Sequence, residues 1–314
     1  MKVSVKVPAT TANFGSGFDC FGMALPIYNI VTLEETVLPG TGVELNIVPE
    51  FQNNDMFITE HLPTDENNIA YKAIEMLYNS IGQAPSELKI TIKSSIPIAK
   101  GLGSSASVIV GGLIAANELL NKPADEAALL SIAAEIEGHP DNVTPAFTGG
   151  LVLSSIEDDG SVFYRKMQWP EEWHLTIFIP DYELVTEISR SVLPSEVPMQ
   201  DAIFDSRRTA MFVEALHTHD ADLMKLALQD RLHQPYRAKL VPGLEEIVSA
   251  LKHEENVIGC TLSGAGPAIL VVSQKNNIEK IKSIVTENWA NYNVKTSIYT
   301  VKPEEKGAEI IESV

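Results

Sequence analysis

The chain lacks several features that mark other classes of protein. Only two of its 314 residues are cysteines, Cys20 and Cys260. Two thiols so far apart match neither a zinc-ligand spacing nor a disulfide framework, so each is predicted to be a small buried hydrophobic residue. No apolar run approaches the ~20 residues that a membrane-spanning helix needs. The opening segment, MKVSVKVPATTANFG, has no apolar stretch of signal-peptide length. These absences predict a cytoplasmic protein without membrane association.

Basic residues are also scarce. Lys and Arg together number 23 against 42 Asp and Glu, which gives a formal net charge of −19. Aromatic residues make up 7% of the chain and are not interleaved with basic ones. An acidic surface repels phosphate backbones, and no platform for stacking bases is evident, so general nucleic-acid binding is excluded. A small anion held by a few local positive groups remains compatible with this composition.

The chain has the length of two domains, at roughly 150 residues per domain, and we place them at residues 1–167 and 168–314. Alternating apolar residues predict strands in the first half, two of them joined as a hairpin through Pro39-Gly40. The expected strands cover 2–8, 29–38, 42–49, 87–95, 150–156 and 161–167. Helical spacing predicts helices over 67–81 and 123–137, whereas GHPDNVTPAFTGG, residues 138–150, is rich in turn residues and predicts a loop.

The second half predicts a different pattern. Strands are expected at 174–180, 257–263, 268–273 and 294–301, with helices near 199–217, 221–230, 243–253 and 277–290. With the first helical region taken as one unit, the order is β-α-β-β-α-β, the split βαβ arrangement. The tail PEEKGAEIIESV, residues 303–314, is expected to be a solvated or loosely docked end.

The sharpest local feature is the segment PIAKGLGSSAS, which a predicted strand precedes and a predicted apolar helix follows. Its residues are Pro97, Ile98, Ala99, Lys100, Gly101, Leu102, Gly103, Ser104, Ser105, Ala106 and Ser107. The two glycines allow a tight turn. The serines then occupy a first helical turn, whose free N–H groups and dipole form a site suited to phosphate. A glycine turn with a serine helix cap is the plainer alternative.

Two familiar phosphate loops and one hydrolase motif do not fit. No G-x-x-x-x-G-K-[ST] is present, which excludes a Walker A loop. Gly101-x-Gly103-x-x-Ala106 is a variant of the dinucleotide fingerprint, but a second helix follows the first where that fold needs a strand. No G-x-S-x-G is present either, so the serine pair does not indicate a serine hydrolase.

Three segments together resemble the GHMP kinases, the superfamily of galacto-, homoserine, mevalonate and phosphomevalonate kinases. PIAKGLGSSAS resembles its phosphate-binding motif, VPATTANFGSGFD at 7–19 its first motif, and TLSGAGPAILVV at 261–272 its third. The resemblance covers essentially the whole chain. It implies a two-domain α+β fold with an N-terminal domain like the second domain of ribosomal protein S5 and a C-terminal ferredoxin-like domain. It also implies ATP and Mg²⁺.

Within this superfamily the chain resembles the homoserine kinase family. HPDNVTPAFTGG at 139–150, TEISRSVLP at 186–194 and DRLHQPYR at 230–237 carry the likeness, and Ser16 departs from it where proline is common. The resemblance implies phosphorylation of L-homoserine in threonine biosynthesis, and a homodimer is typical of the family. The open alternatives are a superfamily kinase with another acceptor, such as mevalonate, a phosphomevalonate or a sugar, and a non-catalytic ligand sensor.

The resemblance also implies roles for single residues. Homoserine carries a carboxylate, an ammonium group and a hydroxyl, and a guanidinium fork matches a carboxylate. Arg190 and Arg237 are therefore expected to bind the carboxylate, and Asp19 the ammonium group or the reacting hydroxyl. The expected supporting contacts come from Asn13, Asn142 and Thr186. Four residues separate Thr186 from Arg190, so on a helical turn both would face one way. Of these residues, Asn13, Asp19, Asn142 and Arg190 are the predicted catalytic set.

The remaining expected roles are those of the magnesium ligands and of the proton acceptor. By resemblance, Glu135 is expected to bind Mg²⁺ together with the hydroxyl of Ser105, or of Ser104, and Glu137 is the rival acid. Relatives in the superfamily use an aspartate as general base, and asparagine Asn142 stands at that place here. We therefore expect direct attack of the hydroxyl without a dedicated strong base, with Asp141 as the alternative base.

Overall fold

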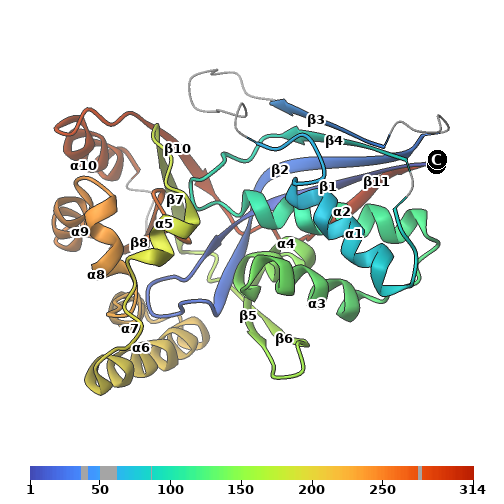
Figure 1. Ribbon diagram of the computed structural model, residues 1–314. Helices are drawn as coiled ribbons and strands as arrows, with labels where there is room; N and C mark the ends of the chain where they lie inside the picture. Colours follow the sequence, from blue (N-terminus) through green and yellow to red (C-terminus); the bar gives the residue numbers. More distant parts are fainter. Residues whose placement is uncertain (37–41, 50–61, 86, 275–277) are drawn as a thin grey trace.

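The computed structural model describes residues 1–36, 42–49, 62–85, 87–274 and 278–314. Its strands form two sheets, a seven-stranded one and a four-stranded one, which lie side by side in Figure 1. The first sheet contains β1 (Lys2–Ala12), β2 (Phe21–Glu35), β3 (Val43–Pro49), β4 (Leu88–Ser94), β5 (Leu151–Ile156), β6 (Val162–Met167) and β11 (Glu309–Ser313). No helix among these residues is long and apolar enough to cross a bilayer.

Four helices cover one side of the first sheet (Figure 1): α1 (Ile69–Ser80), α2 (Ser104–Leu119), α3 (Glu126–Glu137) and α4 (Pro140–Thr148). Helix α2 is buried along most of its length, because it packs against β1 and β2 on one side and against the other three helices. This burial explains why its sequence is apolar nearly all round. It also fixes the helix N-terminus, at Ser104, near the middle of the molecule (Figure 1).

The second sheet has the predicted split βαβ topology. Its strands are β7 (His174–Pro180), β8 (Val257–Leu262), β9 (Ile269–Ser273) and β10 (Thr296–Val301), in the antiparallel order β10-β7-β9-β8. The helices are α5 (Thr186–Ser191), α6 (Met199–Thr218), α7 (Ala221–Ala227), α8 (Gln234–Arg237), α9 (Leu244–Lys252) and α10 (Ile278–Ala290), and a 3₁₀ turn covers Ala238–Leu240. The predicted two-domain α+β fold class is confirmed.

One apolar cluster crosses from the first sheet to the second. It joins Phe14 and Phe21, from either end of the β1–β2 connection, to Ile177 of β7, Phe212 of α6 and Leu270 of β9. The rings of Phe21 and Phe212 stack with their centroids 4.4 Å apart. The two halves therefore share a core, and the boundary between residues 167 and 168 stays a prediction.

The predicted hairpin of residues 29–49 is wrong. β2 pairs with β4 in antiparallel fashion, and β3 lies beyond β4 and parallel to it. Parallel neighbours need a crossover connection, which α1 supplies between β3 and β4. The expected turn at Pro39-Gly40 lies outside the described residues.

The expected loop at 138–150 contains helix α4. Pro140 occupies the first turn, where its missing N–H costs nothing. The helix ends at Gly149, whose φ is +74°. Residues 140–146 are all buried, so packing outweighs the turn preference of the two prolines in this segment.

The loosely docked tail is also a wrong expectation. β11 pairs with β1 along its length, and the backbones of Lys2 and Val314 exchange two hydrogen bonds of 2.7 and 3.0 Å. The last residues therefore belong to the first sheet (Figure 1).

Candidate active site

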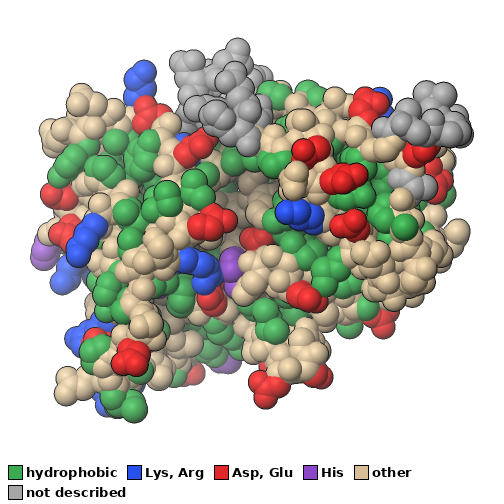
Figure 2. Space-filling view, in the orientation of Figure 1, with side chains coloured by type: hydrophobic (Ala, Val, Ile, Leu, Met, Phe, Trp, Pro, Cys, Tyr) green, Lys and Arg blue, Asp and Glu red, His purple; other side chains and the backbone are tan. Residues whose placement is uncertain are grey.

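A cavity of about 590 Å³ lies where the two halves meet. Figure 2 shows the surface hollowed near the middle of the face, with acidic, basic and histidine side chains close together. The walls of the cavity are formed by the segment before α2, the ends of α3 and α4, helix α5, and the turns around Asn13 and Gly264. Every residue predicted to contact the acceptor lines it: Asn13, Asp19, Asn142, Thr186, Arg190 and Arg237.

The phosphate-loop segment forms one wall of this cavity. Residues 97–105 line it, whereas Ala106 and Ser107 point into the core and are fully buried. Gly103 is the helix cap, with a left-handed φ of +66° and no side-chain hydrogen bond to the helix. The first turn of α2 therefore presents N–H groups that no side chain caps, next to the cavity. This geometry suits an anion.

The glycines of this segment are required by protein neighbours. A Cβ at Gly101 would collide with the carbonyl oxygen of Ser263, and one at Gly103 with the hydroxyl of Thr10. The Ser263 hydroxyl donates to the Gly101 carbonyl at 2.7 Å, and the Gly264 N–H donates to the Ala12 carbonyl at 3.1 Å. The third motif thus braces the phosphate loop against the end of β1.

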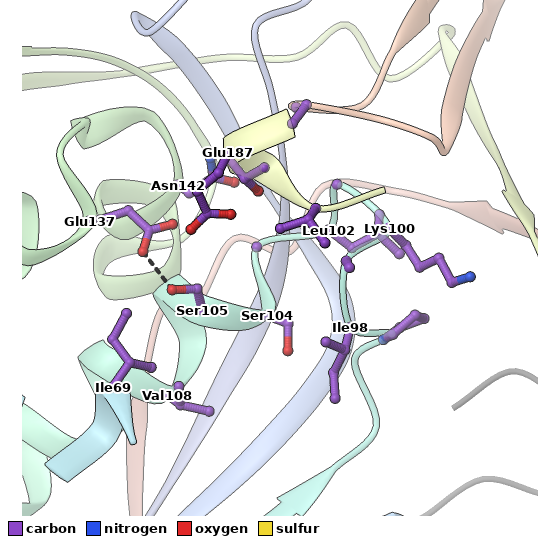
Figure 3. A pocket seen from close by; sticks show the side chains of 18 of the residues that line it. Ile69, Ile98, Lys100, Leu102, Ser104, Ser105, Val108, Glu137, Asn142 and Glu187 are labelled. Carbon is purple, nitrogen blue, oxygen red and sulfur yellow. Dashed lines mark hydrogen bonds between the residues drawn. The ribbon is translucent and has the colours of Figure 1, made fainter. Parts of the chain in front are cut away.

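Lys100 is not the solvated loop lysine that its position favours. The residue is 1% exposed, and its Nζ donates to the backbone carbonyl of Tyr182 at 2.5 Å. In Figure 3 its ammonium group points away from Ser104 and Glu137. Leu184 also donates its N–H to the Ala99 carbonyl at 2.9 Å. The loop is therefore tied at two points to the segment that leads into α5.

The acid beside the phosphate loop is Glu137. The Ser105 hydroxyl donates to its carboxylate at 2.7 Å, and both residues line the cavity (Figure 3). Burial raises the pKa of Glu137 above its usual value, against the opposing charge of His139. Glu135 is exposed and does not line the cavity. Of the two acids considered for Mg²⁺, the rival Glu137 lines the cavity and the expected Glu135 does not, so we assign the magnesium role to Glu137 as a prediction.

A sequence signal for this choice existed. The buried residues of α3 include Ala133, and a residue four positions further on lies on the same helix face. Glu137 follows Ala133 at that spacing, and Glu135 does not. A carboxylate and a hydroxyl are oxygen ligands of the kind that Mg²⁺ binds. The pair Glu137 and Ser105 therefore fits this ion.

Asp19 and Arg190 meet across the cavity in a two-pronged ion pair. The two terminal nitrogens of Arg190 donate to the two carboxylate oxygens of Asp19 at 2.8 and 3.1 Å. Both side chains are about one-third exposed. Asp19 and Asn13 have left-handed backbones, with φ of +55° and +75°. Asn13 fixes the turn, because its amide accepts from the Asp19 N–H at 3.1 Å and donates to the Gly264 carbonyl at 2.8 Å.

Arg237, from α8, is 1% exposed. It donates from Nε to the Ser189 carbonyl at 3.1 Å, and from one terminal nitrogen to the Gly264 carbonyl at 3.3 Å and to His233 Nδ1 at 3.2 Å. Burial, together with the charge of Arg190, lowers the pKa of Arg237 to about 10. The group still carries its charge at neutral pH.

Helix α4 supplies Asn142, and Asp141 of this helix pairs with the cap residue His139, a pair that the sequence did not single out as a unit. The Thr10 hydroxyl donates to the Asn142 amide oxygen at 2.7 Å. Asp141 is 1% exposed and bonds His139 Nδ1 at 2.6 Å. Burial acts to lower the pKa of His139, but the hydrogen bond and charge of Asp141 outweigh it and hold that pKa above its usual value.

The far end of the cavity is more apolar. Ile69, Ile98 and Val108 line it, and Figure 3 shows them on the side opposite Glu187. Ile98 belongs to the segment that the sequence singled out, whereas sequence reasoning missed Ile69 and Val108. Their side chains belong to elements whose meeting depends on the whole fold, so no local pattern marks them.

Comparisons with known proteins agree with this geometry. Residues 68–150 match the GHMP kinases N terminal domain, and residues 212–291 match the GHMP kinases C terminal region. A homoserine kinase of Carboxydothermus hydrogenoformans is 38% identical over 312 residues, covering 98% of this chain and 96% of the relative. One of Clostridium botulinum is 43% identical over 282 residues, 90% of each chain. The chain belongs to the homoserine kinase family of GHMP kinases.

Solved structures agree with this family assignment. A crystal structure of homoserine kinase from Cytophaga hutchinsonii superposes with a TM-score of 0.84 at 27% identity, covering 99% of this chain and 97% of that one. A mevalonate kinase structure, at 18% identity and a TM-score of 0.66, shares the fold. The family is one of enzymes, so the chain is a kinase, and its cavity is the candidate active site.

Proposed function

We propose that the chain transfers the γ-phosphoryl group of ATP to the hydroxyl of L-homoserine and so forms O-phospho-L-homoserine. One observation carries the proposal: a single cavity joins an uncapped helix N-terminus to two arginines and an aspartate. The first feature suits a phosphate, and the second suits a small molecule with both a carboxylate and an ammonium group. Relatives named homoserine kinase, which align over nearly the whole chain, support the same acceptor.

ATP would lie along the wall formed by residues 97–105. Its phosphates would meet the N–H groups at the start of α2, and its adenosine would extend toward Ile69, Ile98 and Val108. Glu137 and the Ser105 hydroxyl would hold Mg²⁺, which when bound neutralises charge on the phosphate oxygens.

The acceptor would lie on the opposite side, among residues of both halves. Arg190 and Arg237 would bind the carboxylate, and Asp19 would bind the ammonium group. Asp19 and Arg190 pair with each other in the structure. Binding of a zwitterion would replace this one ion pair by two, which preserves charge balance in the cavity. Asn13, Asn142 and Thr186 would contact the remaining polar atoms.

The reaction would proceed without a dedicated strong base. Asn142 lines the cavity and has no basic group, and by resemblance it stands where superfamily relatives carry an aspartate base. Its neighbour Asp141 is paired with His139, whose raised pKa favours the charged imidazolium. The Oδ1 atom of Asp141 is already engaged by both His139 and the Asn142 side chain, at 2.6 and 3.2 Å. Catalysis would thus consist of positioning the hydroxyl and stabilising charge on the transferring group.

The decisive experiment is coupled ADP release with Mg-ATP and one acceptor at a time. L-homoserine, mevalonate, galactose and no acceptor are compared at equal concentration. The proposal expects turnover with homoserine alone. Turnover with mevalonate or galactose instead would retain the kinase and discard the roles of Arg190 and Arg237. No turnover with any acceptor, despite Mg-ATP binding, would contradict the proposal and favour a ligand sensor.

A further inference from the structure

One buried side chain in contact with the arginine pair has no role in the reaction described so far. His233 is fully buried and stands at the start of α8, four residues before Arg237. Its Nε2 lies 2.9 Å from the carbonyl oxygen of Gly15, and its Nδ1 lies 3.2 Å from a terminal nitrogen of Arg237. A carbonyl only accepts and a guanidinium only donates. His233 must therefore be neutral, with its proton on Nε2 and its lone pair on Nδ1 directed to Arg237.

The surroundings of His233 hold this form in place. Burial lowers its pKa and outweighs the opposing charge of Asp230. The carboxylate of Asp230 accepts the backbone N–H groups of Leu232, His233 and Gln234 at 3.0, 2.8 and 3.2 Å. The turn that carries the imidazole is thereby fixed, and so is the start of the helix that carries Arg237.

Phe18 completes the arrangement. Its ring stacks on the imidazole with centroids 5.1 Å apart and an angle of 19°. The guanidinium carbons of Arg237 and Arg190 lie 5.2 and 5.6 Å from the centroid of the same ring. The attraction of each cation to the ring offsets the repulsion between two arginines that must face one carboxylate.

Within the described part of the chain, one hydrogen-bond donor of Arg237, its second terminal nitrogen, remains free for a ligand. Its Nε and one terminal nitrogen are engaged by Ser189, Gly264 and His233. The second terminal nitrogen has no hydrogen bond to another described residue, and Arg237 lines the cavity. His233 is the one side-chain acceptor among these partners. Its Nδ1 adds a third hydrogen bond to the two that the carbonyls accept, and together the three hold the guanidinium group in its orientation.

We propose that His233 is a positioning residue, which acts through Nδ1 to aim the free nitrogen of Arg237 at the carboxylate of the acceptor. This inference rests on the proposed function, because it takes the acceptor to be an amino acid. It predicts that His233 affects binding of L-homoserine and leaves the nucleotide side of the cavity unchanged.

Two amide variants separate the two hydrogen bonds of the imidazole. In His233→Gln the amide reaches the position of Nε2, which keeps the donor to Gly15 and removes the acceptor for Arg237. In His233→Asn the amide oxygen can stand near Nδ1, which keeps the acceptor and loses the contact with Gly15. Both variants lose the ring, so the comparison between them isolates the acceptor.

The measurement is KM for L-homoserine and for ATP, with the melting temperature of each variant as a control. We expect His233→Gln to raise the KM for homoserine about tenfold, the loss of roughly one hydrogen bond to a charged group. The KM for ATP should change less than about twofold in His233→Gln. The His233→Asn variant should keep most of the homoserine affinity that His233→Gln loses.

Other outcomes would overturn the inference. Equal increases in both KM values, or equal effects of the two variants, would give His233 a purely structural role. If His233→Gln does not fold, His233→Asn alone provides the test. A homoserine KM raised tenfold in this variant, with an unchanged KM for ATP, would contradict the role of Nδ1. An unchanged homoserine KM would support that role. A wild-type enzyme that fails to phosphorylate homoserine would instead refute the proposed function.

Discussion

At the scale of single residues, Glu137 and Glu135 form a matched pair for locating the metal. They lie two positions apart on α3, but only Glu137 lines the cavity and accepts a hydrogen bond from Ser105. We expect Glu137→Gln to lower kcat/KM for Mg-ATP by on the order of 100-fold, and Glu135→Gln to change it less than about twofold. Steady-state kinetics at varied Mg²⁺ tests this. An effect of Glu135→Gln as large as that of Glu137→Gln would contradict the assignment.

Glu137→Gln is expected to lower activity without lowering the stability of the fold. Burial raises the pKa of Glu137 above that of the unfolded chain. A carboxyl group whose pKa is higher in the folded than in the unfolded chain contributes to the stability of the fold. The contribution is complete at pH values below the pKa in the unfolded chain, and it is lost as the pH rises through the pKa in the folded chain. At pH 8 the ligand-free Glu137→Gln protein should therefore melt at or above the wild-type temperature although its activity is lower. A lower melting temperature would show that the variant acts by unfolding.

Asp141 provides the test of direct attack at the same scale. Asp141→Asn keeps an acceptor near His139 and removes the only carboxylate of helix α4, whose residues are all described. We expect kcat to fall less than about tenfold, because general-base catalysis typically contributes 10²- to 10⁴-fold and would be lost in full if Asp141 supplied it. Rapid-quench measurement of product formation separates chemistry from release. A collapse of the chemical step at unchanged homoserine binding would identify Asp141 as the base.

At the scale of elements, the phosphate loop and the turn at 263–267 behave as one unit. Gly101 has a φ of +75°, and a Cβ there would meet the carbonyl of Ser263. Gly82, at the end of α1, has a nearly equal φ of +71° but open space around it. Alanine at either position carries the same backbone strain of about 1–2 kcal/mol. Only Gly101→Ala adds a collision between the two loops.

We therefore expect Gly101→Ala to weaken ATP binding at least tenfold beyond any effect of Gly82→Ala, because the N–H groups at the start of α2 would be displaced. Titration with ATP, together with melting temperatures for both variants, provides the measurement. Equal losses in the two variants would mean that backbone strain alone explains the defect and that the turn does not brace the loop.

Elements also show how far the sequence could predict this structure. The spacing of apolar residues predicted the split βαβ half, because that signal is local. The resemblance of three glycine-rich segments to the GHMP kinases predicted the cavity wall. Helix α4 escaped prediction, since its two prolines favour a turn and only burial against the sheet makes it helical. The parallel pairing of β3 with β4 depends on where α1 packs, which no short window of sequence contains.

At the scale of the whole molecule, the chain ends hold the first sheet together. β11 follows the last strand of the second sheet, returns to the first sheet and covers the edge of β1. The segment before it is also anchored, because Gly150 donates to the Glu304 carbonyl at 2.7 Å and Ala308 donates to the Ala146 carbonyl at 2.9 Å. An uncovered strand edge is a template for association with other chains.

Removal of residues 309–314 should lower the melting temperature by about 4 °C or more, since a loss of 1 kcal/mol shifts it by roughly 2–4 °C in chains approaching this size. It should also promote association, measurable by light scattering, while leaving the KM for ATP unchanged, because β11 does not line the cavity.

Ile311→Thr is the control for this truncation. Its side chain is 52% exposed, so this variant keeps the backbone pairing and should melt within about 1 °C of wild type. A truncated chain that melts with wild type would show that the pairing with β1 contributes nothing to stability.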